Sequence, residues 1–179
     1  MKPIVCLWTC MGLAAGLAQV GAVEPAPMPK VGDIAPLVAG KTQDNKTWRM
    51  ADVLGDKAVL IYFYPKDNTP GCTRQACGWR DRLGELQQAN VELVGISFDD
   101  VASHKAFADQ HNLNFKLIAD TRGQNADAYG VRVAPGKNQA RRVSFLVDRA
   151  GRIVAITDSS DPERHLKEMG AAIARLKSN

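Results

Sequence analysis

AVLIYFYPKDNTPGCTRQACGWRDR, residues 58 to 82, is the stretch that decides the fold. Its first part, Ala58–Tyr64, is a short apolar run of β-branched and aromatic residues that ends before Pro65. Such a run predicts a strand that is buried on both faces, at the centre of a sheet. A polar turn over residues 65–71 leads into a segment whose pattern suits a helix. Cys72 is therefore predicted at a strand-to-helix junction.

The start of a helix is a favourable place for a reactive cysteine. The first amide N–H groups have no partner within the helix, and the helix dipole places partial positive charge there. An anion is stabilised at that point, so a sulfur held there is favoured as the thiolate, which is its nucleophilic form. Cys72 is therefore the candidate nucleophile.

The second cysteine of this stretch, Cys77, follows five positions later. On an intact helix, residues five apart have Cα atoms about 8–9 Å apart and point in different directions. A disulfide needs Cα atoms within about 7 Å. If Cys72 and Cys77 pair, the first helical turns must therefore unwind. A loop this small restrains the unfolded chain little, so a redox role is expected rather than a stabilising one.

The pattern Pro65-x-x-x-Thr69-x-x-Cys72, followed by Cys77, resembles the active-site signature of the peroxiredoxins, in the AhpC/TSA family. TPGCT with a second cysteine five residues on is similar to the bacterioferritin-comigratory, or Q-type, branch. The resemblance implies a thioredoxin-like fold and a thiol peroxidase. It implies that Cys72 attacks a hydroperoxide and becomes a sulfenic acid, that Cys77 resolves it as a disulfide, and that Thr69 and Pro65 surround the sulfur. As a lone residue, Thr69 would more often be a helix cap.

A fixed cation is needed beside the sulfur, because negative charge builds on the peroxide oxygens in the transition state. The segment Arg-x-Ser-Phe-Leu-x-Asp resembles the one that carries the active-site arginine of this family, and it assigns that position to Arg142. Arg141 would point to the opposite side of an extended strand and is expected on the solvated surface. Gln75 stands where many relatives have a glutamate.

The rest of the chain predicts an α/β fold with a mixed central sheet, helices on both faces and an N-terminal hairpin extension. The hairpin is expected between residues 30 and 56, because short apolar runs are punctuated there by Pro and Gly. One helix is expected from Cys72 to Asn90, and another begins at a capping box of Ser160 and Glu163. The other predicted elements are strands at Val91–Ser97, Lys116–Ala119, Val143–Val147 and Arg152–Thr157, helices at Val101–Gln110 and Thr121–Tyr129, and a loop at 131–140.

The length of 179 residues and a composition of 45% hydrophobic and 23% charged residues predict one globular domain, placed at residues 31–177. The net charge of +4 is small and dispersed, so no nucleic-acid partner is expected. No cofactor or metal is expected either, because His104, His111 and His165 are not at zinc-ligand spacing. Solvated surface positions are predicted for these three histidines.

The N-terminus differs from the rest of the chain. Lys2 precedes an apolar stretch that ends in small residues, which predicts a secretory signal peptide over residues 1–22 and a leader over 23–30. An exported, periplasmic enzyme is then expected. The alternatives are an uncleaved anchor, since residues 4–23 approach the length that spans a bilayer, and a lipid anchor at Cys10.

Other functions remain open at this point. A protein thiol–disulfide exchanger usually uses Cys-x-x-Cys, and a copper-binding module of related fold usually uses Cys-x-x-x-Cys; this chain has neither at Cys72. A purely structural domain is the last alternative. The expected partners are a hydroperoxide substrate and a thioredoxin-like dithiol reductant, and the protein is expected to be a monomer or weak dimer.

Overall fold

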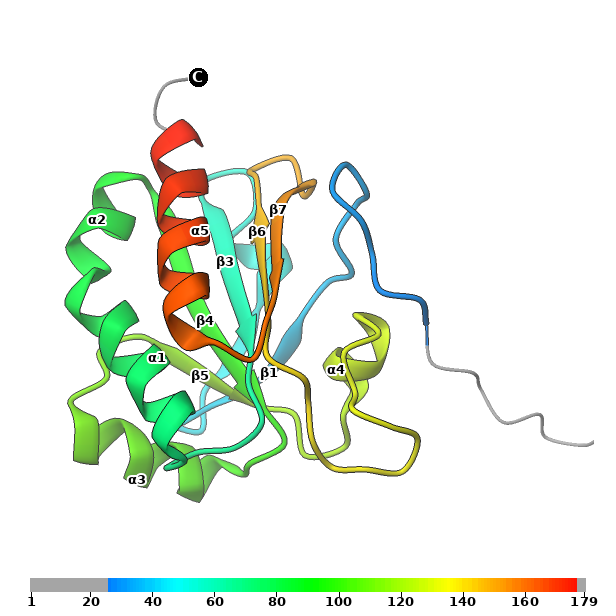
Figure 1. Cartoon of the computed structure of the whole chain (residues 1–179), viewed down its shortest axis with the longest axis vertical. Helices are drawn as coiled ribbons and strands as arrows, with labels where there is room; N and C mark the ends of the chain where they lie inside the picture. Colours follow the sequence, from blue (N-terminus) through cyan, green and yellow to red (C-terminus); the bar gives the residue numbers. More distant parts are fainter. Residues whose placement is uncertain (1–25, 177–179) are drawn as a thin grey trace, which may run out of the picture.

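The computed structural model describes residues 26–176, so the predicted signal peptide lies outside the described residues. These residues form a seven-stranded sheet in the order β2-β1-β5-β4-β3-β6-β7 (Figure 1). The strands are β1 (Ala39–Thr42), β2 (Thr47–Arg49), β3 (Ala58–Phe63), β4 (Val91–Ser97), β5 (Lys116–Ala119), β6 (Val143–Val147) and β7 (Ile153–Asp158). The helices are η1 (Met50–Asp52), α1 (Pro70–Asp81), α2 (Leu83–Gln88), α3 (Val101–His111), α4 (Gln124–Ala128) and α5 (Pro162–Leu176).

Strand β3 is the central element. It pairs in parallel with β4 and antiparallel with β6, and every one of its residues is buried. Alternate side chains point to opposite faces of a strand. Leu60 and Tyr62 therefore join one core cluster, while Ile61 and Phe63 join the other. The prediction of a strand buried on both faces is confirmed.

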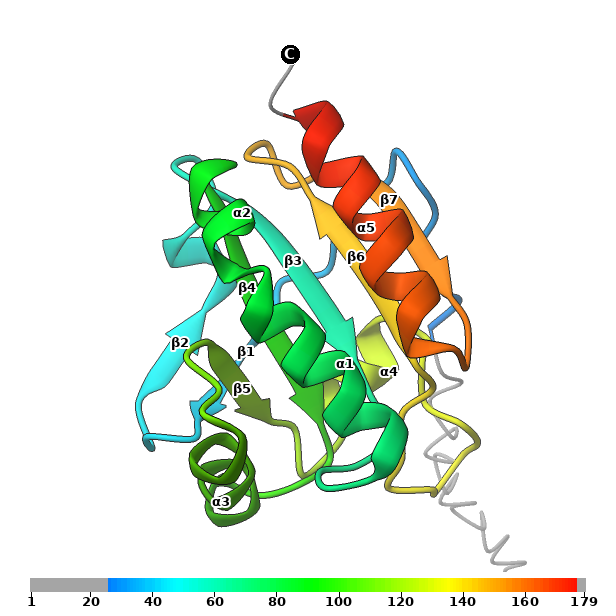
Figure 2. The same cartoon turned by 60° about the vertical axis from the view of Figure 1, so that its left-hand side comes forward.

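Helices cover both faces of the sheet, and different elements form the layer on each face. Helices α1, α2 and α5 lie across one face, and α4 lies behind the sheet on the other (Figure 2). Side chains of α3 join the first cluster, and the second cluster is closed by residues of the N-terminal segment, η1 and α4. The predicted mixed sheet with helices on both faces and an N-terminal hairpin is confirmed.

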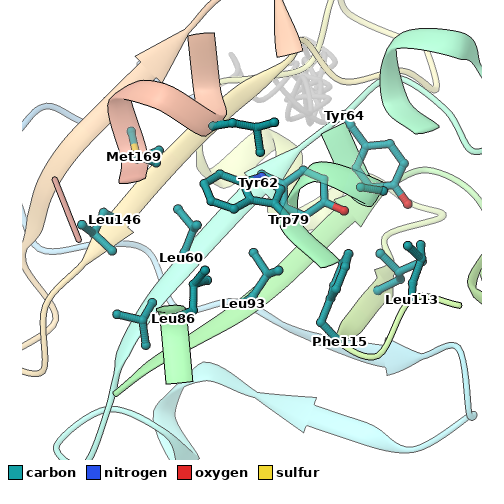
Figure 3. Close-up of a cluster of buried hydrophobic side chains, with 14 of the residues drawn as sticks. Leu60, Tyr62, Tyr64, Trp79, Leu86, Leu93, Leu113, Phe115, Leu146 and Met169 are labelled. Carbon is teal, nitrogen blue, oxygen red and sulfur yellow. The ribbon is translucent and has the colours of Figure 1, made fainter. Parts of the chain in front are cut away.

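The core under α1 and α5 holds the helix that carries both cysteines. Trp79 of α1 is fully buried in the same cluster as Tyr62, Leu86 and Met169 (Figure 3). Gly78 lets α5 approach closely, because a Cβ at this position would lie 2.3 Å from a methyl carbon of Leu166. The C-terminal half of α1 is thus tightly packed.

Two local predictions are wrong. The helix expected from Cys72 to Asn90 is divided at Arg82, where the side chain donates to the carbonyl of Leu166 in α5 at 2.8 Å and the backbone leaves the helical region. At the start of α5, the amide of Glu163 bonds to Asp161 at 3.0 Å rather than forming a capping box with Ser160. Between residues 26 and 176, none of the helices has the length and apolarity needed to span a bilayer.

Candidate active site

Cys72 lies in the first turn of α1, two residues after Pro70 begins the helix. Strand β3 ends at Phe63, and the loop over residues 64–69 leads directly into α1, which begins at Pro70. The Cys72 side chain is only 1% exposed. The predicted strand-to-helix junction is therefore present, and it places a nearly buried sulfur among the free amide groups of a helix start.

Arg142 directly precedes β6 and reaches the sulfur from the neighbouring strand. Because β6 runs antiparallel to β3, with Val143 opposite Phe63, residue 142 lies beside the beginning of α1. The Nη2 atom of Arg142 donates to Sγ of Cys72 at 3.3 Å. A Cβ at Gly71 would lie 3.1 Å from that same nitrogen, so the glycine leaves room for the guanidinium. The structure thus places Arg142, which is buried, in contact with the Cys72 sulfur.

Two further contacts fix the orientation of the Arg142 guanidinium. Nη1 donates to Oε1 of Gln75 at 2.5 Å, and Nε donates to the carbonyl of Ser160 at 3.3 Å. Gln75 is fully buried one turn after Cys72, so the helix itself carries both the sulfur and one acceptor for the arginine. From the sequence, Gln75 stands out only because many relatives have a glutamate there. Its contact with Arg142 could be anticipated only from an amide side chain in the second turn of the helix that carries Cys72.

Pro65 and Thr69 lie on the loop between β3 and α1, and both are half-buried. Thr69 is the N-cap residue of α1, yet its hydroxyl donates backwards to the carbonyl of Lys66 at 3.1 Å and makes no side-chain cap bond. Pro65 lines a cavity of about 290 Å³ together with Arg142, Ser159 and Ser160. The cavity opens beside the guanidinium that contacts the sulfur.

Cys77 is half-buried in the second half of α1, and both cysteines are free thiols in this structure. The helix is intact between them. Beyond Cys77, the helix is held by Trp79 and by Arg80, whose Nη1 donates to the carbonyl of His111 at 2.7 Å. A direct bond between the two sulfurs requires the turns before these anchors to unwind.

A buried polar network holds the loop that precedes α1. The Asp67 carboxylate accepts hydrogen bonds from Tyr64 at 2.7 Å, from Ser103 at 2.8 Å and from Nδ1 of His104 at 2.9 Å. The Asp67 amide donates to Asp99 at 2.9 Å. Burial alone would raise the pKa of Asp67, but the hydrogen bond and charge of His104, with the two hydroxyl groups, lower it. The loop is therefore fastened to α3 by an ionised carboxylate.

Replacing Asp67 with asparagine is expected to lower the free energy of unfolding by about 3 kcal/mol, since a buried charge-assisted network loses one partner. The lowered pKa means that the wild-type advantage is complete above the unfolded-state pKa of about 3.9 and is lost as pH falls through the native-state pKa. Urea unfolding of both proteins between acid and neutral pH measures this. The exposed Asp44→Asn is the matched control. A stability difference that persists unchanged at low pH would contradict the prediction.

The prediction of solvated surface histidines is wrong for two of the three. His104 and His165 are fully buried, whereas His111 is half-buried and packs its ring against Phe107. His165 lies between Ser144 and Ser159, close to Arg142. The error has a simple cause: a polar residue is predicted outside unless its partners are known, and these partners come from distant parts of the chain.

Arg141 behaves as predicted. Its side chain is 39% exposed, pairs with Asp158 at 2.5 Å and donates to the carbonyl of Gly130 at 3.3 Å. Among residues 26–176, no three or more His, Cys, Asp or Glu side chains gather in a way that could hold a metal ion.

Comparison with known proteins identifies relatives that cover most of the described residues. The family model described as "AhpC/TSA family" matches residues 31–156. Peroxiredoxin Bcp of Escherichia coli (strain K12) is 40% identical over 141 residues, which cover 76% of this chain and 90% of that protein. The chloroplastic Peroxiredoxin Q of Triticum aestivum is 38% identical over 146 residues, covering 81% of this chain and 67% of that protein.

Solved structures agree. Peroxidoxin BcpB from Mycobacterium tuberculosis superposes with a TM-score of 0.78 at 30% identity, covering 83% of this chain and 98% of that one. Xanthomonas campestris Peroxiredoxin Q superposes with a TM-score of 0.71 at 26% identity, covering 78% and 91%. With a thioredoxin-like sheet and a buried cysteine held by an arginine at a helix start, the chain belongs to the AhpC/TSA family and is a thiol-dependent peroxidase of the peroxiredoxin type.

Proposed function

We propose that the protein reduces hydrogen peroxide and organic hydroperoxides through Cys72, with Cys77 as the resolving cysteine. The observation that carries the proposal is the 3.3 Å contact between Nη2 of Arg142 and the Cys72 sulfur at the start of α1. A cation and free helix amides meet at one nearly buried sulfur, which favours the thiolate and places positive charge where a peroxide oxygen would become negative.

In the first step the Cys72 thiolate attacks the terminal oxygen of the hydroperoxide. A sulfur–oxygen bond forms, the oxygen–oxygen bond breaks, and the leaving oxygen takes up a proton to depart as water or alcohol. Arg142 stabilises the charge on the two oxygens as they separate. Thr69 and Pro65 border the approach to the sulfur, the threonine as a hydrogen-bonding group and the proline as a shield against water.

In the second step the Cys77 thiol attacks the sulfenic acid sulfur, the disulfide forms, and water leaves. The first turns of α1 unwind, which breaks the contacts that Arg142 makes with Cys72 and Gln75 in the helix. A thioredoxin-like dithiol then reduces the disulfide by thiol–disulfide exchange, and the helix forms again. No protein redox partner is needed for the first step.

Replacing Cys77 with serine tests the division of labour between the two cysteines. The variant is expected to consume one equivalent of peroxide at a rate close to that of the wild type and then to stop with thioredoxin as donor, because no disulfide can form. Mass spectrometry after one turnover would show Cys72 with one added oxygen, whereas the wild type would lose two hydrogens. Sustained turnover of the variant with thioredoxin would contradict the assignment of Cys77.

A steady-state assay distinguishes the peroxidase from a general thiol–disulfide exchanger. We expect hydrogen peroxide and an alkyl hydroperoxide to be consumed with thioredoxin and its reductase as electron source, and insulin to be reduced far more slowly. The intact helix between the two cysteines supports this expectation, because a dithiol exchanger needs its partner sulfur within bonding reach. Insulin reduction faster than peroxide consumption would overturn the proposal.

We also propose that the enzyme is exported, on the basis of the apolar N-terminal stretch and the small residues near Ala22. Mass spectrometry of protein from the periplasmic fraction would then give a mature chain that starts near Val23. Soluble protein that retains Met1 would contradict cleavage, and recovery in the membrane fraction would favour the anchor alternatives.

A further inference from the structure

Buried His165 lies in a chain of contacts that ends at the reactive sulfur. It is in the first turns of α5, and its imidazole bridges two segments that flank Arg142. Nδ1 lies 2.8 Å from Oγ of Ser144 on β6, and Nε2 lies 2.9 Å from the carbonyl oxygen of Ser159 in the turn between β7 and α5. The imidazole is fully buried.

The partners of this histidine fix the position of one ring hydrogen. A carbonyl oxygen can only accept, so Nε2 must carry the hydrogen that it donates to Ser159. In the neutral ring, Nδ1 accepts from the hydroxyl of Ser144. Burial lowers the pKa of His165, and the positive charge of Arg142 lowers it further, against an opposing effect of the bond to Ser159. The neutral Nε2–H tautomer is therefore the favoured state.

The turn that His165 holds also holds Arg142. The amide of Ser159 donates to the backbone carbonyl of Arg142 at 3.3 Å, and the carbonyl of Ser160 accepts from Nε of the guanidinium at 3.3 Å. Ser160 is itself exposed, so little packing fixes the position of its carbonyl. The part-buried bond from His165 to the preceding carbonyl ties this part of the turn to α5, while the amide of Glu163 in α5 bonds to the turn farther on, at Asp161.

We propose that His165 is a positioning residue of the peroxidase reaction, which holds the turn at Ser159 and Ser160 so that the Arg142 guanidinium points at the Cys72 sulfur. It touches neither substrate nor sulfur. Its effect is confined to the first step, because the contacts of the arginine with α1 are given up when the helix unwinds. The inference rests on the roles proposed above for Cys72 and Arg142.

Two substitutions of His165 by an amide side chain distinguish the effect of the hydrogen bond to Ser159 from the effect of merely keeping a polar side chain at this position. His165→Gln keeps a donor near the position of Nε2, while His165→Asn carries its amide near Nδ1, where it can serve Ser144 but not Ser159. We expect the asparagine variant to react with hydrogen peroxide about tenfold more slowly in single turnover, and the glutamine variant to stay within about twofold of the wild type. The later step, disulfide formation, should keep its rate in both.

The controls distinguish positioning from loss of stability. Met169→Ala removes a buried side chain one turn along α5 and should destabilise the fold without slowing the peroxide step. If His165→Asn does not fold, Ser144→Ala, which frees the other end of the imidazole, should slow the same step, and wild-type speed in that variant would overturn the inference. Equal rates for the glutamine and asparagine variants, whether fast or slow, would overturn it as well.

Cys72→Ser and Arg142→Met are measured in the same series. If either variant keeps the wild-type rate, the proposed function fails. If both lose the reaction while every His165 variant reacts as the wild type does, only the role of His165 fails.

Discussion

Cys72→Ser is expected to lower the rate of peroxide consumption by at least about 1000-fold, because the hydroxyl cannot replace the thiolate as nucleophile and the covalent route is lost. Serine differs from cysteine by one atom at a site that is 1% exposed, so the fold should be kept. Peroxide loss after mixing with reduced protein measures the effect, and circular dichroism checks the fold.

The Cys77→Ser variant serves as the matched control, since it removes the same chemical group from the same helix. It should still consume its single equivalent of peroxide. The assignment of the nucleophile would be wrong if the Cys72→Ser protein consumed peroxide at the wild-type rate. It would also be wrong if Cys77→Ser, and not Cys72→Ser, abolished the consumption of the first equivalent of peroxide.

Arg142→Met is expected to slow the reaction of the reduced protein with hydrogen peroxide by about 100- to 1000-fold, the cost of removing one donor from a preorganised anion-stabilising site. The substitution removes the hydrogen bonds of the guanidinium to both Cys72 and Gln75. Arg142→Lys keeps the charge but not the planar arrangement of three donor nitrogens, so an intermediate loss is expected. Single-turnover kinetics at several peroxide concentrations would give the second-order rate constants.

The neighbouring arginine gives a strict control. Arg141→Met removes the same kind of side chain one residue earlier. It breaks the pair with Asp158 and the bonds to the carbonyl of Gly130 and the sulfur of Met28, none of which involves α1, and it should leave the rate within about twofold of the wild type. A larger loss in Arg141→Met than in Arg142→Met would contradict the choice between the two arginines.

Much of this site is predictable because its key residues follow a local rule. The strands around β3 are apolar runs with clear limits, and three of them, β4, β5 and β6, have the predicted bounds. A cysteine at a helix start and an arginine before a strand can be recognised from motif and period. Their meeting depends on β6 pairing with β3, and the predicted mixed sheet does not specify that pairing.

What could not be predicted depends on contacts between distant segments. The break after α1 falls at Arg82, and this residue is neither a glycine nor a proline that would mark a helix end. The Arg82 side chain instead donates to the carbonyl of Leu166, which is 84 positions away in the sequence. The burial of His104 in α3 depends on the Asp67 carboxylate on the loop before α1, and that of His165 on a serine in β6. Periodicity describes one element at a time, so buried polar groups that join elements escape it.

The anchors at the two ends of α1 have a consequence for the proposed cycle, in which the helix unwinds for the disulfide and forms again after reduction. Forming a helix from a free chain is slow to begin, since several residues must be ordered before the first hydrogen bond compensates. Here the Asp67 network holds the residues before α1, and Trp79 and Arg80 hold those after Cys77. After reduction the helix can therefore grow from existing boundaries at nanoseconds per residue rather than nucleate anew. For the disulfide cycle proposed above, we therefore expect electron delivery rather than refolding to limit the return of the reactive thiol.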